Sequence, residues 1–212
     1  MRQLTRERAL IFRITHIRNV PWILRHGLHC PNGPVLDPGF VPIGAADLIG
    51  KRARRRVPIP PHGSFQDYIP FYFTPRSPML LNVQTGYGVP QVEGTDIVIL
   101  MSSVHVLQEQ GIAYVFTDCH AFMQAAQWSS ELQDLDRIDW PLLRSSDFAW
   151  DPDDPGKKDR YQAEVLVHRH LPLAAIRGIG CGDASAKQRL EEMMGQAGVR
   201  VPVSAEPTWY CR

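Results

Sequence analysis

The apolar segments of this 212-residue chain are short, and prolines and glycines separate them. There are 18 prolines and 16 glycines, and the prolines lie mainly at segment edges, so short elements are favoured over long helices. No apolar run approaches the ~20 residues of a membrane-spanning helix. The regular alternation of strand and helix that is typical of a doubly wound sheet is also missing. The pattern therefore predicts an α+β protein with six to eight short strands and small helices.

The expected elements follow from apolar periodicity and from capping residues. Strands are expected at 9–17, 68–73, 96–101, 113–117, 163–167 and 176–181, with an edge strand at 199–203. Helices are expected at 20–26 (closed by Gly27), 104–110 (ended by Gly111), 119–130 (capped by Asp118) and 184–197. Residues 79–83 suit either a strand or a short helix.

Residues 31–66 are rich in proline and glycine and read as a long loop, with room for one short helix near 45–49. A loop of this length in a compact domain usually has a function. Five cations lie within residues 51–56, whereas four aspartates lie between residues 147 and 154. Because the formal net charge is only +1, a polyanionic partner would have to be held by local charge.

Several kinds of site are excluded by the residues themselves. The four cysteines form no CxxC pair, so we expect no metal site. No secretory signal is recognisable, so we expect a cytoplasmic protein whose cysteines are free thiols. There is no GxxxxGK[ST] or GxSxG motif. His168 and His170 are two residues apart on a strand, and surface histidines explain them better than a metal site does.

Glu164 is the most informative charged residue, because it begins an otherwise apolar strand. Burying a carboxylate is costly unless it is paired or useful. From the residues alone, a structural ion pair with Arg160 or Arg169 explains Glu164 better than a catalytic role does.

Five blocks of sequence together resemble the DarT toxins. They occur in order, and the middle block contains a PFYFTPRSPM core. The blocks are residues 14–28, 47–52, 67–80, 116–121 and 160–164. The resemblance implies a single domain over 1–212 with an ADP-ribosyltransferase fold related to the poly-ADP-ribosylating enzymes, with mixed central β-sheets and short helices.

The same resemblance implies the reaction and the partners. DarT enzymes use NAD to attach ADP-ribose to a base in single-stranded DNA, and they are the toxins of bacterial toxin–antitoxin pairs. We therefore expect NAD as co-substrate, single-stranded DNA as acceptor and a DarG-type macrodomain antitoxin. We also expect a monomer in the bacterial cytoplasm, without membrane contact. Thymidine is the first choice of base and guanosine the second.

Carried over residue by residue, the resemblance also assigns the site. A carboxylate stabilises the positive charge of the ribose carbon that loses nicotinamide, and a fixed cation stabilises the developing base anion. The expected catalytic residues are Glu164 and Arg52. The expected NAD-binding residues are His16, Ile17, Asn19, Leu24, Arg52 and Tyr72. The expected DNA-binding residues are Tyr68, Arg76, Met79, His120, Arg160 and Arg54.

Two alternatives stay open at this point. A non-catalytic module for single-stranded nucleic acid would use the basic run and the aromatic residues without Glu164. A transferase of the same fold could instead modify RNA or protein. Each assigned residue also has an ordinary structural explanation, such as core packing for His16 and Tyr72 or a solvated loop for Arg52 and Arg54.

Overall fold

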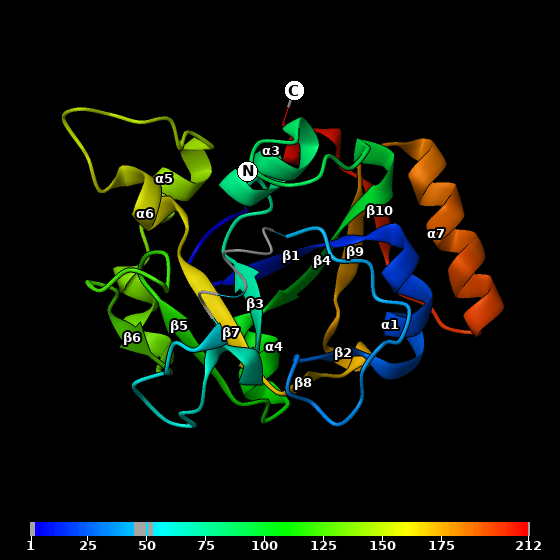
Figure 1. The fold of residues 1–212 in the computed structure, drawn as a ribbon, viewed down its shortest axis with the longest axis horizontal. Helices are drawn as coiled ribbons and strands as arrows, with labels where there is room; N and C mark the ends of the chain where they lie inside the picture. The colour runs from blue at the N-terminus through cyan, green and yellow to red at the C-terminus, as the bar shows by residue number, and fades with distance from the viewer. Residues whose placement is uncertain (1–2, 45–49, 51–52, 212) are drawn as a thin grey trace.

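The computed structural model describes residues 3–44, 50 and 53–211. In these ranges eight strands form one sheet in the order β10-β9-β4-β1-β3-β7-β5-β6, and β2 and β8 form a small separate ribbon (Figure 1). All pairs are antiparallel except β9 and β10. The strands are β1 (Leu10–His16), β2 (Leu28–His29), β3 (Tyr68–Tyr72), β4 (Ile97–Ser103), β5 (Tyr114–Thr117), β6 (Trp128–Ser129), β7 (Glu164–His168), β8 (His170–Leu171), β9 (Gly178–Cys181) and β10 (Val203–Ala205).

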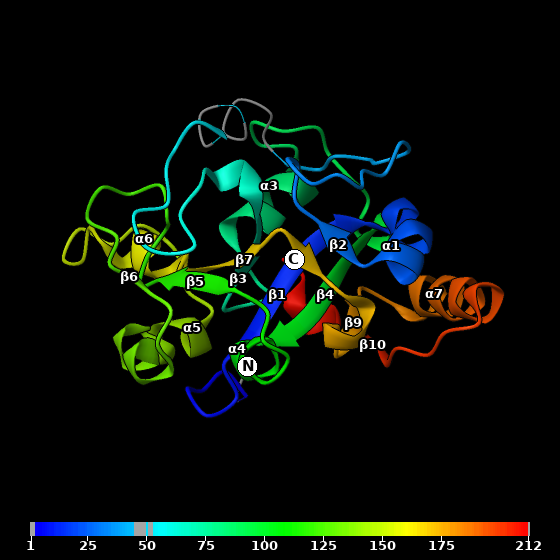
Figure 2. The ribbon, with the colours of Figure 1, turned by 90° about the horizontal axis from the view of Figure 1, so that it is seen from below.

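The helices are short apart from the last one. They are α1 (Val20–His26), α3 (Pro78–Thr85), α4 (Val104–Glu109), α5 (Trp140–Ser145), α6 (Lys157–Tyr161) and α7 (Ala184–Ala197). Helix α7 begins where the Asp183 carboxylate accepts the Ala186 amide and ends at Gly198, whose φ of 67° suits glycine. It packs against α1 and β10 at one end of the molecule (Figure 2).

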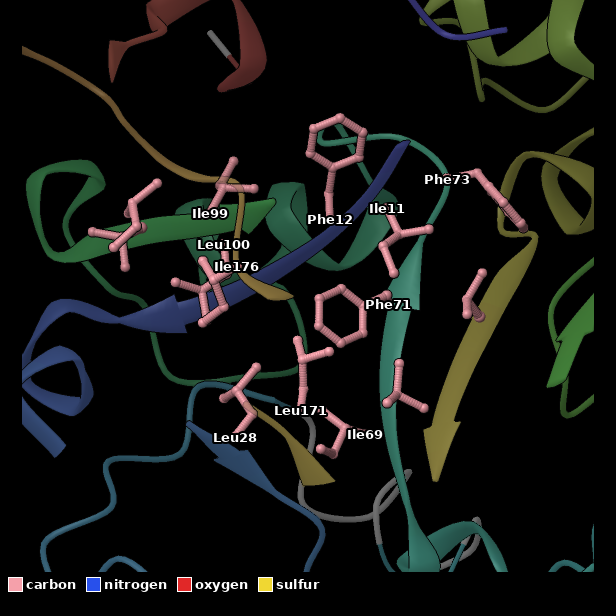
Figure 3. Packing of buried hydrophobic residues seen from close by; sticks show 14 of the residues in the cluster. Ile11, Phe12, Leu28, Ile69, Phe71, Phe73, Ile99, Leu100, Leu171 and Ile176 are labelled. Atoms are coloured by element: carbon pink, nitrogen blue, oxygen red, sulfur yellow. The ribbon is translucent and has the colours of Figure 1, made fainter. Parts of the chain in front are cut away.

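Strand alternation gives the β3–β7–β5 part of the sheet two different faces. On one face Phe71, Val165 and Phe116 join the main core, which also receives side chains of β1 and β4 (Figure 3). On the other face Tyr68, Leu166 and Val115 join a satellite cluster (Val57, Phe65, Tyr68, Val115, Ala121 and Leu166). Because residues two apart on a strand share a face, Glu164 lies on the satellite side with Leu166.

Strands β1 and β3 separate along their length, and this separation positions the site. Within the described residues they pair at Phe12 and Tyr72 and then diverge (Figure 3). In the gap, Arg13 Nη1 donates to the Pro70 carbonyl at 2.9 Å, which satisfies a backbone group that a continuous ladder would have used. The divergence leaves a cleft between two halves of one sheet.

Most expected elements are confirmed within a residue or two. Strands occur at six of the seven expected places, and the edge strand expected at 199–203 is shifted, because β10 spans Val203–Ala205 and shares only Val203 with the prediction. Residues 79–83 belong to helix α3, which Ser77 caps by accepting the Leu80 amide. The expected helix near residues 45–49 lies outside the described residues.

The helix expected at 119–130 is wrong. Residues 118–127 form a loop that leads to β6, and the Asp118 carboxylate accepts the Gln127 amide across it at 2.9 Å. The loop lies over the beginning of β7, because the His120 amide donates to the Asp159 carbonyl and the Ala121 amide donates to the Glu164 carboxylate. These tertiary hydrogen bonds replace the local ones that a helix would have made. No helix in the described ranges is long and apolar enough to cross a membrane.

Candidate active site

The Glu164 carboxylate is completely buried at the start of β7. Its Oε1 accepts the backbone N–H of Ala121 at 3.2 Å and lies 3.4 Å from Nε2 of His120. Hydrogen bonds of this kind offset the cost of removing a carboxylate from water. The loop between β5 and β6 therefore covers the carboxylate and holds it in one orientation.

A cavity of about 540 Å³ is lined by Tyr72, the β3 residue paired with Glu164, although Glu164 itself is not among its lining residues. Arg13 and Thr15 of β1, Pro70 and Tyr72 of β3 and Leu166 of β7 contribute to its wall, so it occupies the cleft where β1 and β3 diverge. Its volume is in the usual range for sites of small molecules and cofactors. The Cα of Tyr72 is paired with that of Glu164, which places the carboxylate next to the wall and behind the loop that covers it.

The outer rim of the cavity is formed by the segment at residues 31–44. Leu36 and Phe40 line the cavity and are 60% and 51% exposed. Exposed apolar side chains grouped around a cleft mark a binding surface. Part of the long loop therefore borders the cavity, and its function stays a prediction.

Asn19 anchors that rim. Its Nδ2 donates to the Val41 carbonyl at 2.9 Å and to Thr15 Oγ1 at 3.0 Å, and its Oδ1 accepts the Val41 amide at 2.8 Å. The side chain is fully buried and borders the cavity. Asn19 therefore holds the rim against β1, and its side chain has little remaining capacity to bind NAD directly.

The other residues expected to bind NAD are distributed unevenly. Tyr72 lines the cavity. His16 ends β1, where its Nδ1 accepts the Arg18 amide at 3.1 Å and burial lowers its pKa. Ile17 and Leu24 are buried in the main core and are not among the residues that line the cavity, so the structure does not bring their side chains to it.

Of the residues expected to bind DNA, Tyr68 and His120 are buried, whereas Arg76 and Met79 are partly exposed. Tyr68 is 1% exposed, its hydroxyl donates to the His62 carbonyl at 2.6 Å, and burial raises its pKa to about 12. Tyr68 belongs to the satellite cluster and contributes to the cavity wall, so it has almost no surface open to solvent on which a base could stack. Met79 lines the cavity from α3. Arg76 is half-buried beside Tyr161, whose hydroxyl donates to the Arg76 carbonyl.

The remaining DNA-binding candidates differ in whether carboxylates of the protein already pair with their side chains. His120 lies against Glu164. Arg160 is held by two carboxylates, because its guanidinium bonds both oxygens of Asp154 and also Asp139. Hydrogen bonding to Asp154 raises the pKa of Arg160 further. Arg54 is exposed and makes no ion pair with the described residues, and Arg52 lies outside them.

Two groups of this site were missed by sequence reasoning. Arg13 is a charge within an apolar strand, which is the same signal that singled out Glu164. The Ala121 amide had no signal, because a backbone donor is revealed only by folding. In the part of the chain that the structure describes, no three histidine, cysteine, aspartate or glutamate side chains gather as a metal site.

Comparison with known proteins gives consistent results. The model of a family described as "DarT: ssDNA thymidine ADP-ribosyltransferase, DarT" matches residues 12–211. A "DNA ADP-ribosyl transferase" of Escherichia coli O127:H6 (strain E2348/69 / EPEC) is 42% identical over 205 residues, which are 96% of this chain and 94% of that protein.

Solved structures agree in fold. Thermus sp. 2.9 DarT in complex with ADP-ribosylated ssDNA has a TM-score of 0.90 at 33% identity, covering 97% of both chains. The same protein in complex with NAD+ has a TM-score of 0.86 at 32% identity, covering 97% of this chain and 98% of that one. Thermosipho africanus DarTG in complex with ADP-ribose, at 23% identity and a TM-score of 0.76, shows the same fold over 95% of this chain and 50% of that one.

Proposed function

The chain belongs to the DarT family of ssDNA thymidine ADP-ribosyltransferases, and on that premise we propose which of its residues carry out the transfer. The protein is an NAD-dependent DNA ADP-ribosyltransferase and the toxin of a toxin–antitoxin pair. The reaction breaks the bond between nicotinamide and the ribose carbon and joins that carbon to a ring nitrogen of thymine. Nicotinamide leaves with the bonding electron pair, and the ring nitrogen loses its proton.

Glu164 is the proposed catalytic carboxylate. The ribose carbon becomes positively charged as nicotinamide leaves, and a fixed negative charge beside it stabilises that state. The observation that carries this role is the completely buried carboxylate, which Ala121 holds next to the wall of a cofactor-sized cavity. The same carboxylate is suited to accept the proton of the thymine ring.

NAD is proposed to occupy the cleft between β1 and β3. Tyr72 is the proposed wall of the nicotinamide slot, and His16 and Arg13 are polar groups at or near the β1 side. Arg52 is proposed to stabilise the developing base anion or to hold the diphosphate, as the resemblance implies. The Asn19–Val41 hydrogen bonds support a rim that closes over the bound dinucleotide.

Single-stranded DNA is proposed to reach Glu164 from the side of the basic run. Arg54 is the strongest phosphate contact among the described candidates, because it is exposed and unpaired there. His120 and Arg76 remain proposals as substrate contacts near the loop that covers Glu164. Thymidine is the proposed base, in agreement with the family description, and guanosine is the second choice.

The remaining expectations are also proposals. A DarG-type macrodomain antitoxin is the proposed partner, and the DarTG chain of Thermosipho africanus is about twice as long as the part this chain covers. We further propose that residues 1–212 form one domain, which acts as a monomer in the bacterial cytoplasm without a metal.

The test is product analysis of a degenerate single-stranded DNA pool incubated with the protein and NAD. We expect release of nicotinamide that requires DNA, and ADP-ribose on thymidine in a restricted sequence context. RNA and protein acceptors run in parallel should stay unmodified. If the protein retards DNA in a gel but leaves NAD intact, it is a binding module and not a transferase. If guanosine is modified, guanosine and not thymidine is the acceptor base.

A further inference from the structure

Arg55 connects two segments that are far apart in the sequence. Its Nη2 donates to the Met123 carbonyl at 2.9 Å, and its guanidinium carbon lies 5.3 Å from the centre of the Phe122 ring. Both partners belong to the 118–127 loop. The segment after the basic run passes beside β6 in both Figure 1 and Figure 2.

The segment that carries Arg55 is itself well anchored. The Arg55 carbonyl accepts the Phe65 amide at 3.0 Å, and the Val57 amide donates to Gly63. Val57 and Phe65 are buried in the satellite cluster together with Ala121. The backbone of Arg55 is therefore fixed relative to the face of the sheet on which Glu164 lies.

The other end of the connection leads directly to Glu164. Phe122 and Met123 follow Ala121, whose amide donates to the carboxylate. A shift of the backbone at Met123 would therefore also move the hydrogen-bond donor that orients Glu164. Arg55 stands three residues after Arg52, the expected catalytic arginine, in the sequence.

We propose that Arg55 is a positioning residue, which holds the 118–127 loop in place over Glu164 by attaching it to the segment that carries Arg55. This role differs from a phosphate contact, because one guanidinium nitrogen is bound to a carbonyl and the guanidinium carbon is placed over an aromatic ring. A planar guanidinium makes both contacts at once, whereas a lysine ammonium is a point charge. The inference rests on the proposed role of Glu164.

The experiment compares Arg55→Lys and Arg55→Met with wild type at saturating NAD and DNA. We expect kcat to fall about tenfold or more in both variants, because a small misplacement of a reacting group is costly. We expect the Kd for DNA to change less than about threefold, with an unchanged salt dependence. Arg200→Lys, at an exposed arginine after α7, is the matched control and should behave as wild type.

Phe122→Leu removes the same contact from the other side. If Arg55 acts through Phe122, the Arg55→Lys and Phe122→Leu double variant should be no slower than the slower single variant. Additive losses in kcat would overturn the proposal. So would wild-type kcat in Arg55→Lys, or a loss confined to DNA affinity. Glu164→Gln is assayed alongside, because its activity would refute the proposed catalytic role of Glu164, whereas an inactive Glu164→Gln with an active Arg55→Lys refutes only this inference.

Discussion

Tyr72 and Glu164 are paired across the β3–β7 ladder, but only Tyr72 borders the cavity. The carboxylate is covered by His120 and Ala121, which approach its Oε1 to 3.4 and 3.2 Å. A cofactor in the cleft would therefore contact the Tyr72 ring first. It would approach the carboxylate where β1 and β3 come together at Phe12 and Tyr72. In the proposed mechanism the β5–β6 loop therefore orients the carboxylate in addition to connecting two strands.

Glu164→Gln should abolish transfer while preserving the fold. Glutamine keeps an oxygen for the Ala121 amide but has no charge, so we expect a rate at least ~10³-fold lower, the order expected for a principal electrostatic or proton-transfer group. The measurement is nicotinamide release with a thymidine-containing oligonucleotide, together with a melting curve. Unchanged turnover in a well-folded Glu164→Gln protein would remove Glu164 from the mechanism.

Asn19→Ala should loosen the rim of the cavity. It removes three hydrogen bonds that join Thr15, Asn19 and Val41, so we expect the KM for NAD to rise about tenfold, corresponding to ~1.4 kcal/mol. Ser102→Ala is the control, because it removes a buried hydrogen bond to the Ala175 carbonyl away from the cavity. An equal rise of KM in both variants would show that stability, and not the rim, sets the affinity for NAD.

Arg160→Gln should leave the salt dependence of DNA binding close to that of wild type. Asp154 and Asp139 already neutralise the Arg160 side chain, so it releases few counterions from DNA. Arg54→Gln is the matched comparison, and we expect its salt slope to fall by about 1. The measurement is DNA affinity at several salt concentrations. A fall of about 1 in Arg160→Gln would mean that Arg160 leaves its carboxylates for a phosphate.

Acidification should destabilise the β2–β8 ribbon. Burial lowers the pKa of His29 from 6.5, and the charge of His170 lowers it further. The two imidazole rings are stacked, with their centres 4.2 Å apart. Below pH 6.5 the unfolded chain therefore binds a proton more readily than the folded one, so this stabilising contribution is present above pH 6.5 and is lost as pH falls toward the folded pKa.

We expect the melting temperature to decrease between about pH 7.5 and 5.5, and to decrease less in His29→Gln. His16 and His168, whose pKa values burial also lowers, retain their share of the effect in that variant. Parallel melting curves for the two proteins over this range would show that His29 does not contribute.

Much of the fold was predictable from local sequence. Apolar periodicity found the strands of the large sheet apart from β6 and most of β10, and Gly27 marked the end of α1, because caps and periodicity act between residues close in the chain. The segment at 119–130 failed for the opposite reason. Its amides bond to Asp159 and Glu164, about 40 residues later, so helix propensity was overridden by long-range partners.

The candidate site divides in the same way. The sequence by itself determined that Glu164 begins an apolar strand, that a basic run stands at residues 51–56, and that five ordered blocks resemble one family. Only the tertiary structure decided that Ala121 holds the carboxylate, that Asn19 holds the rim, and that Tyr68 is a core residue and Arg160 a neutralised one. These roles depend on contacts between distant segments, and a side chain's burial and partners exist only after the strands have paired.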